Sequence, residues 1–266
     1  MSPELLRAWE RRYGLVSPGR SDGGFRLYSE KDVELLSRMK ALVAEGVSPA
    51  EAAVLARRTG GRMSAATEAA QPLHEGFAAG LESFDEVVAQ AALDRVFGTV
   101  SIERALTDVV LPYLRSLGDR WQLGEATIGQ EHFASSMIRS RLLSLAGVWD
   151  VGVGPLAILA CLPGERHELG LVCFGLCLRR RGWRITYLGA DTPIESVSAT
   201  VDATDPGSVV LAGTTPEGFE SQRVLLRTLA GRVSLLLAGA GSSSELAEAV
   251  GARALLGDPV AAARSL

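Results

Sequence analysis

The sequence predicts a multidomain fold with three parts: an amino-terminal helix-and-hairpin unit, a four-helix bundle, and a doubly wound α/β sheet of five parallel strands. Two short apolar pieces flank a Gly-Gly turn near the amino end. Four helical patterns with short connections follow them. From Gly152 onward, apolar strand-like runs alternate with helical ones. We expect the parts to span residues 1–58, 67–150 and 151–266, with a Gly-rich linker at 59–66.

The 266-residue chain has the composition of a globular protein with a sizeable core, at 47% apolar and 22% charged residues. It has no apolar run of membrane-spanning length and no signal peptide, so we expect a cytoplasmic protein without a membrane partner. Its three cysteines lack the paired spacing of a zinc site, and we expect reduced, buried thiols. Net charge is −4, yet residues 1–60 hold ten basic and eight acidic side chains, which permits a nucleic-acid surface there.

The amino-terminal part is predicted to begin with a short basic helix from Glu4 to about Tyr13, followed by a hairpin that also carries arginines. Two more helices are expected, at 30–45 with Ser29 as N-cap and at 49–58. A helix followed by a basic hairpin can place the helix in a major groove and the hairpin along the phosphates. The alternative is a solvated basic helix on a small core.

The run Leu-Arg-Ala-Trp-Glu-Arg-Arg-Tyr-Gly at residues 6–14, Pro-Gly-Arg at 18–20 and Gly-Gly-Phe-Arg-Leu-Tyr-Ser at 23–29 resemble the winged helix-turn-helix domain of MerR-family regulators. That family has one more helix before this segment, so either the start codon was assigned too late or the DNA-binding unit is incomplete. We favour a late start, because without that helix the unit would expose apolar surface. The resemblance implies double-stranded operator DNA as partner. The side chains that it implies at the DNA are Arg7, Trp9, Arg11, Arg12, Tyr13, Arg20, Arg26 and Tyr28.

The bundle is predicted from helical patterns at roughly 68–81, 84–97, 101–122 and 127–146. Each break carries a residue that can cap the next helix: Ser83, Ser101 and Thr127. Trp121 ends one helix, and Glu131 and His132 begin the next. Taken alone, these three residues are better explained as a core Trp and a surface Glu-His pair than as a ligand-binding group.

The sheet is predicted from strands at 156–162, 183–189, 208–213, 233–239 and 253–257. Three strand ends carry residues suited to a ligand, and the carboxyl ends of parallel strands form one crevice. The first end continues into Glu165-x-His167-x-x-Gly170, the third ends in Ala212-Gly-Thr214, and the fourth ends in Gly239-Ala-Gly241. Small residues there would let a bulky ligand approach the backbone.

His167 is the candidate metal ligand. A neutral imidazole can bind a metal through one ring nitrogen while a carboxylate, here Glu165, holds the other. A surface His at a loop tip is the alternative. A zinc-protease motif is excluded, because Leu171 stands where the second His would be. A dinucleotide site is poorly supported as well, since no Gly-x-Gly-x-x-Gly follows the first strand.

This pattern resembles the cobalamin-binding domain of corrinoid mutases, methyltransferases and sensors. The resemblance implies that His167 is the lower ligand of cobalt, with Glu165 as its partner and Gly170 at a close approach. It also places the nucleotide tail of the cofactor along Ala212, Thr214, Gly239 and Gly241. Two departures concern that tail: the family's Ser-x-Leu is not preserved near residues 212–214, and its Gly-Gly is Gly-Ala-Gly here.

The spacing Trp-x9-Glu-His in the bundle is similar to that of light-sensing MerR-family repressors that carry adenosylcobalamin. The resemblance implies that Trp121, Glu131 and His132 cover the upper face of the cofactor. Those photoreceptors have a His directly after the Trp, where this chain has Gln122. No ligand role is expected for His74.

The sequence thus predicts a DNA-binding transcriptional repressor and not an enzyme, with no catalytic residues. We expect bound adenosylcobalamin to control its assembly into a dimer or tetramer, and thereby its operator binding, in response to light. Two alternatives stay open: a corrinoid carrier for methyl transfer, and a regulator that senses cobalamin or redox state without light.

Overall fold

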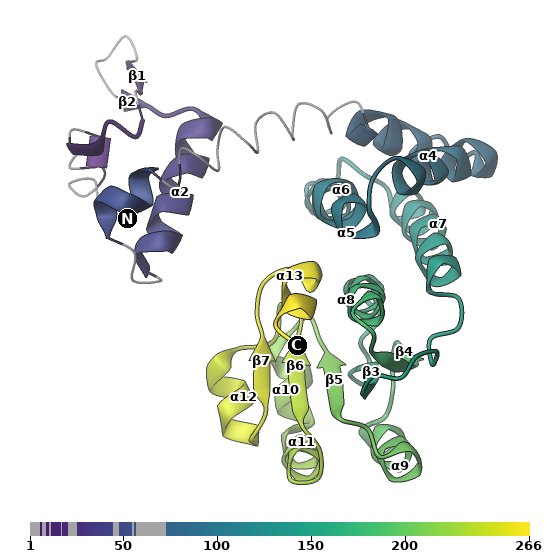
Figure 1. Cartoon of the computed structure of the whole chain (residues 1–266). Coiled ribbons are helices and arrows are strands. Elements are labelled where there is room, and N and C mark those ends of the chain that lie inside the picture. The colour runs from purple at the N-terminus through teal and green to yellow at the C-terminus, as the bar shows by residue number, and fades with distance from the viewer. Residues whose placement is uncertain are drawn as a thin grey trace. The chain divides into compact units, whose positions relative to one another are not determined.

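The computed structural model describes residues 6, 9–10, 12–16, 18–20, 26–44, 48–54, 56 and 73–266. The chain divides into two compact units, Met1–Pro72 and Leu73–Leu266 (Figure 1). The predicted Gly-Gly turn and the predicted linker lie outside the described residues, as do Arg7 and Arg11.

The first unit contains the predicted hairpin and second helix. Strands β1 (Gly19–Arg20) and β2 (Arg26–Leu27) pair antiparallel. Helix α2 (Glu30–Ala44) begins after Ser29, as predicted, because the Ser29 hydroxyl accepts a hydrogen bond from the backbone N–H of Asp32 at 3.2 Å. A core of small and apolar side chains joins α2 to a helix that includes residues 49–54. The buried members of this core are Trp9, Leu15, Val16, Leu36, Met39, Ala52, Ala53 and Ala56.

The second unit begins with the helical bundle. It consists of a helix that includes residues 73–81, then α4 (Glu86–Thr99), a composite helix, and α7 (Ile128–Ala146). Thr127 caps α7 as predicted, in a capping box with Gln130. The predicted cap at Ser83 is wrong by two residues. Asp85 caps α4 by accepting hydrogen bonds from Val87 and Val88, whereas the Ser83 hydroxyl donates to the carbonyl of Gly80.

The composite helix is α5 (Ile102–Ala105), the π-helical turn η1 (Leu106–Val110) and α6 (Leu111–Gln122). The sequence predicted one uninterrupted helix capped by Ser101, and the structure confirms the cap. The wide turn ends two residues before Pro112, whose ring nitrogen cannot donate the backbone hydrogen bond that a regular helix requires.

The five-stranded parallel sheet is confirmed. Its strands are β3 (Leu156–Cys161), β4 (Arg184–Gly189), β5 (Ser208–Ala212), β6 (Leu235–Ala238) and β7 (Arg253–Leu255), in the spatial order β4-β3-β5-β6-β7. The chain reverses its direction of winding between the neighbours β3 and β5. Ligands bind in doubly wound sheets at this kind of switch point, outside the carboxyl ends of the strands.

Helices cover both faces of the sheet (Figure 1). One face carries α8 (Leu169–Arg180) and α13 (Pro259–Arg264), which pack on each other. The other face carries α9 (Ile194–Thr204), α10 (Pro216–Ser221), α11 (Arg223–Ala230) and α12 (Ser244–Val250).

The core beneath α8 and α13 continues into the bundle. One cluster of buried side chains includes Leu142 of α7, Leu176 of α8 and Leu159 of β3. The bundle and the sheet, which the sequence suggested as separate domains, therefore share a continuous apolar core. No helix among the described residues is long and apolar enough to cross a membrane.

Candidate functional site

The loop between β3 and α8 carries His167 at the switch point of the sheet. Gly164 turns the chain there with a φ of +78°, which a residue with a side chain rarely adopts. Asp191, in the loop after β4, fixes this turn with two hydrogen bonds. Its carboxylate accepts a hydrogen bond from the Gly164 N–H at 2.7 Å, and its own N–H donates to the Glu165 carbonyl at 2.8 Å. The backbone of the loop is thus fixed from the neighbouring strand.

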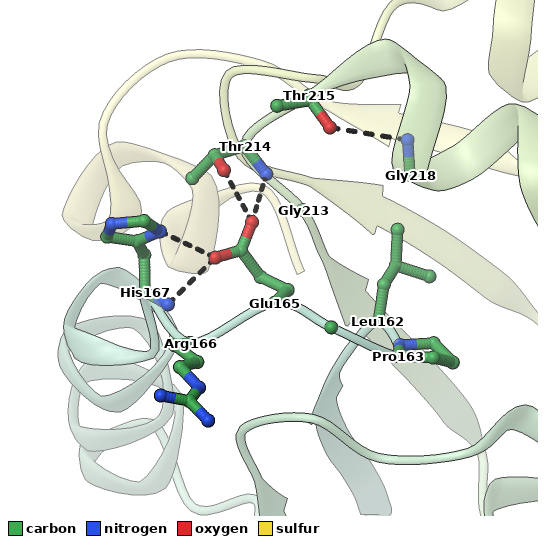
Figure 2. A pocket seen from close by; sticks show the side chains of 10 residues that line it. Leu162, Pro163, Glu165, Arg166, His167, Gly213, Thr214, Thr215 and Gly218 are labelled. Carbon is green, nitrogen blue, oxygen red and sulfur yellow. Dashed lines mark hydrogen bonds and ion pairs between the residues drawn. The ribbon is translucent and has the colours of Figure 1, made fainter.

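Both oxygens of the Glu165 carboxylate are occupied by hydrogen bonds (Figure 2). Oε1 lies 2.6 Å from Nδ1 of the His167 ring and 2.8 Å from the His167 backbone nitrogen. Oε2 accepts from the backbone N–H of Thr214 at 2.7 Å and from its hydroxyl at 2.5 Å. The carboxylate therefore connects the loop after β3 to the loop after β5.

These contacts keep Glu165 ionised. Burial by itself raises the pKa of the carboxyl group, but the hydrogen bonds from Thr214 and His167 prevail and lower the pKa to about 2. An ionised partner favours the proton on Nδ1 of the His167 ring, which leaves a lone pair on Nε2. The His167 side chain is 79% exposed, and in Figure 2 its second ring nitrogen points away from Glu165. The Glu165–His167 hydrogen bond is of the kind that orients a histidine ligand of a metal.

A cavity of about 540 Å³ lies beside this ring. Its walls come from α8, α13 and the ends of β5, β6 and β7. Of the residues predicted to bind a cofactor, the cavity is lined by His167, Gly170, Ala212, Thr214 and Gly239. A smaller hollow of about 330 Å³ is lined by Glu165, His167 and Thr214 among others. His167, Gly213 and Thr214 line both hollows.

The sequence pattern did not indicate the wall formed by residues 255–262. Leu255, Leu256, Gly257, Pro259 and Ala262 line the cavity, as do Leu171 and Phe174 of α8. The sequence could have indicated this wall, because Leu256, Gly257 and Pro259 follow the end of β7, which the sequence predicted as a strand. The other site residues also follow strand ends, where ligands bind in such sheets.

Two glycines that were predicted to make room for a ligand have a different local role. A Cβ atom at Gly239 would lie 2.4 Å from the Gly213 carbonyl oxygen, and one at Gly241 would lie 2.4 Å from the Thr215 backbone. Gly241 also donates a backbone hydrogen bond to Gly213 at 3.1 Å. Gly241 is absent from the cavity lining within residues 73–266. These glycines let the loops after β5 and β6 pack on each other and so shape the cavity rim.

The bundle residues predicted to cover a cofactor lie at helix ends. Tyr113, Leu117 and Trp121 follow one another at intervals of one turn along α6. Tyr113 and Leu117 are buried, whereas Trp121, near the end of the helix, is 49% exposed. Trp121 therefore continues a buried stripe without being covered itself. Glu131 and His132, in the first turn of α7, are partly and largely exposed, and Glu131 accepts a hydrogen bond from the Ser135 hydroxyl at 2.6 Å.

The first unit places the predicted DNA-contacting residues in different environments. Trp9 is only 6% exposed and belongs to the core, so its ring supports the unit from inside. Arg26 pairs with Glu10 at 2.9 Å, which joins the hairpin to the preceding helical segment. Arg12 is exposed, with its guanidinium 5.9 Å from the centre of the Tyr13 ring, and Tyr28 is partly buried. The side chain of Arg20 lies outside the described part of this unit.

The donor set fits one kind of metal centre. Among the described residues, no group of three or more His, Cys, Asp or Glu side chains could hold a metal ion. His167 therefore offers a single donor, beside a cavity with mostly apolar walls. A single imidazole suits a metal whose other positions are filled by an organic macrocycle that the cavity helps to bind.

Comparisons with known proteins identify the family to which the chain belongs. Residues 1–59 match the model of the MerR HTH family regulatory proteins, and residues 73–145 match the model of a B12 binding domain. The chain is 37% identical over 237 residues to the HTH-type transcriptional repressor CarH of Myxococcus xanthus, which covers 84% of this chain and 79% of that protein. The repressor CarA of the same organism is 35% identical over 222 residues, covering 81% of this chain and 74% of its own length.

The fold is also similar to that of the monomethylamine corrinoid protein of Methanosarcina barkeri, with a TM-score of 0.61 at 18% identity, covering 74% of this chain and 97% of that one. At this identity the likeness concerns the fold alone. The chain belongs to the MerR-family transcriptional repressors that combine a helix-turn-helix domain with a B12-binding domain, and it is accordingly a DNA-binding and cobalamin-binding regulator.

Proposed function

We propose that this repressor acts in the cytoplasm under the control of adenosylcobalamin, with Nε2 of His167 as the lower ligand of cobalt. The observation that carries the proposal is the fixed imidazole. Glu165 holds Nδ1 at 2.6 Å, and His167 lines both hollows at the switch point of the sheet. The cavity of about 540 Å³ lies where the nucleotide tail would enter, along Gly170, Ala212 and Gly239.

The proposed upper face is formed by Trp121, Glu131 and His132. The exposed ring of Trp121 supports this role, because a large apolar side chain that extends a buried stripe gains most from a bound group that covers it. When bound, adenosylcobalamin supplies a cobalt–carbon bond that visible light breaks. Trp121 would then lose its covering group, and the bundle would repack.

The proposed output is a change of assembly. With its cofactor intact, the chain forms a dimer or tetramer whose several DNA-binding units grip one operator together, and loss of the upper group dissolves that assembly. We further propose that the exposed Arg12, the hairpin residues Arg20 and Arg26, and the nearby Tyr28 contact the operator, together with Arg7, Arg11 and Tyr13 earlier in the sequence.

The test uses the full chain. Purified protein is incubated with adenosylcobalamin in darkness, freed of excess cofactor by gel filtration, and compared with His167→Ala. The wild type should retain the colour and the larger assembly, and should bind operator DNA in darkness but release it after green light. A colourless wild-type protein, or a His167→Ala variant with an unchanged absorption spectrum, would refute the ligand assignment.

A light-independent cobalamin sensor is the second candidate, and Gln122 favours it, since an amide next to Trp121 is a poor metal ligand. Cofactor-dependent operator binding that is equal in darkness and after green light would identify this function. The corrinoid-carrier alternative lacks such support, because the repressors CarH and CarA are similar over 84% and 81% of the chain, and residues 1–59 match the MerR family model.

A further inference from the structure

Glu168, directly after the proposed cobalt ligand, is a buried acidic residue with no role in the proposed function. Its side chain is 9% exposed. Oε1 accepts a hydrogen bond from Nε of Arg139 on α7, and Oε2 accepts one from the Tyr187 hydroxyl on β4 at 2.6 Å. Burial, and then the hydrogen bond to Glu168, raise the pKa of Tyr187, so the phenol stays protonated and remains a donor. One carboxylate thus connects the His167 loop, the bundle and the sheet.

Arg139 lies on the same face of α7 as the residues proposed to cover the cofactor. Glu131, Ser135 and Arg139 follow one another at intervals of four residues, so they form one line along the helix. Glu131 and Ser135 are joined by a hydrogen bond of 2.6 Å, and Arg139 ends the line at Glu168. From Glu131 to Arg139 this line is about 12 Å long, at 1.5 Å per residue.

We propose that Glu168 is a positioning residue that, through Arg139, fixes the His167 loop to helix α7. This proposal rests on the proposed function. The pair makes the proposed lower ligand and the proposed upper cover parts of one connected structure: His167 precedes Glu168 in the chain, and Glu131 precedes Arg139 by two turns of α7. A shift of α7 then moves the loop that carries the imidazole. In the same way, a displacement of the imidazole moves α7 and with it the bundle.

A second ion pair between the bundle and the sheet provides a matched control. Arg264 of α13 donates to Glu103 of α5 at 2.9 Å, and neither residue adjoins the His167 loop or lines the cavity. If these ion pairs only held the bundle to the sheet, loss of either pair would have the same effect. If Arg139 and Glu168 position the His167 loop, only the loss of that pair should affect the loop.

The experiment compares Glu168→Gln, Arg139→Gln, Arg139→Lys and the double variant Glu168→Gln/Arg139→Gln with Glu103→Gln. Without cofactor, amide hydrogen exchange is measured in residues 164–168. With adenosylcobalamin in darkness, affinity and absorption spectrum are measured, because the spectrum reports whether an imidazole binds cobalt.

We expect Glu168→Gln and Arg139→Gln each to weaken cobalamin binding about tenfold, the lower end of what a lost outer partner costs a metal site. The double variant should be no weaker than either single one, since the two residues act as a unit. Exchange in the loop should rise about tenfold, the bound spectrum should lose part of its imidazole-ligated character, and Arg139→Lys should restore part of the loss because it keeps the charge. Glu103→Gln should leave all three measurements unchanged.

The proposal is overturned if the variants at Glu168 and Arg139 behave like Glu103→Gln. That failure is distinct from failure of the proposed function, which would appear as a wild-type protein that takes up no cobalamin, or as a His167→Ala variant with the wild-type spectrum. The hydrogen exchange of the cofactor-free protein tests the connection of the loop to α7 in either case.

Discussion

Thr214 donates two hydrogen bonds to a single oxygen of Glu165, although the two residues are 49 positions apart in the chain. The second oxygen of the same carboxylate is thereby left to the His167 ring. Residues from two neighbouring strand ends thus determine where the imidazole stands and which of its nitrogens carries the proton. The order at this site depends on the contact between those strands.

The Thr214 hydroxyl is expected to contribute to cofactor binding without touching the metal. In Thr214→Val the backbone N–H still donates to Glu165, but the hydroxyl bond of 2.5 Å is lost and the carboxylate is held less firmly. We expect cobalamin affinity to fall about tenfold in a spectral titration in darkness. Thr228→Val is the control, because the Thr228 hydroxyl bonds only to the Val224 carbonyl on α11. Equal affinities of the two variants would contradict the prediction.

The ionised Glu165 is expected to stabilise the fold in a pH-dependent way. Its pKa is lowered to about 2 in the folded chain from an ordinary 4.5, so the carboxylate stabilises the fold above the ordinary value. This stabilisation is lost as the pH falls from about 4.5 toward 2. At pH 7, Glu165→Gln should lower the free energy of unfolding by about 2 kcal/mol. Urea unfolding of both proteins across this pH range checks it, and a difference that stays constant with pH would show that the carboxylate charge is not responsible.

Gly241 is expected to be required for stability, since a Cβ atom there would lie 2.4 Å from the Thr215 backbone. Gly241→Ala should force the loops after β5 and β6 apart and lower the free energy of unfolding by about 2 kcal/mol. In the control Gly118→Ala, on α6, the new methyl group meets no atom within 4 Å. There the same change should stabilise the protein by about 0.5–1 kcal/mol, because alanine favours a helix. Thermal unfolding of the two variants should therefore shift in opposite directions.

The cavity itself can be tested by filling it. Ala240 lines the cavity and is exposed, so Ala240→Trp adds bulk there without disturbing the core. We expect cobalamin affinity to fall at least about tenfold, because the indole and the nucleotide tail would compete for the same space. Ala261→Trp on α13 is the matched control, since Ala261 is also exposed but does not line the cavity. Binding that is equally strong in both variants would mean that the tail lies elsewhere.

Local sequence signals predicted much of this fold. The apolar run before Pro163 and Gly164 indicated a strand followed by a turn, and His167 lies at that strand end. The cap at Thr127 was predictable because a hydroxyl residue three positions before Gln130 forms a capping box. At Ser83 the same rule failed, because Asp85, two residues later, accepts two backbone N–H bonds. Caps are ambiguous where polar residues cluster.

Contacts between distant segments were beyond the reach of these signals. Nothing near Glu168 in the chain indicates Arg139 or Tyr187, which come from a bundle helix and a neighbouring strand. The glycines after β6 were predicted because a bulky ligand needs space near the backbone. The structure shows that the loop after β5 occupies the space beside these glycines. This contact follows from the packing of the two loops, which local sequence does not indicate.

The three cysteines are free and buried, and burial raises the pKa of the Cys161 thiol to about 12 and that of the Cys177 thiol to about 11. Reaction with an alkylating agent requires a thiolate, so these side chains are protected twice, by inaccessibility and by protonation. Cys161 is the last residue of β3, and its carbonyl accepts a hydrogen bond from Thr192 in the loop after β4. The rate at which Cys161 is alkylated therefore measures how often the strand below the imidazole opens, and cobalamin bound at His167 should slow that reaction in proportion to its occupancy.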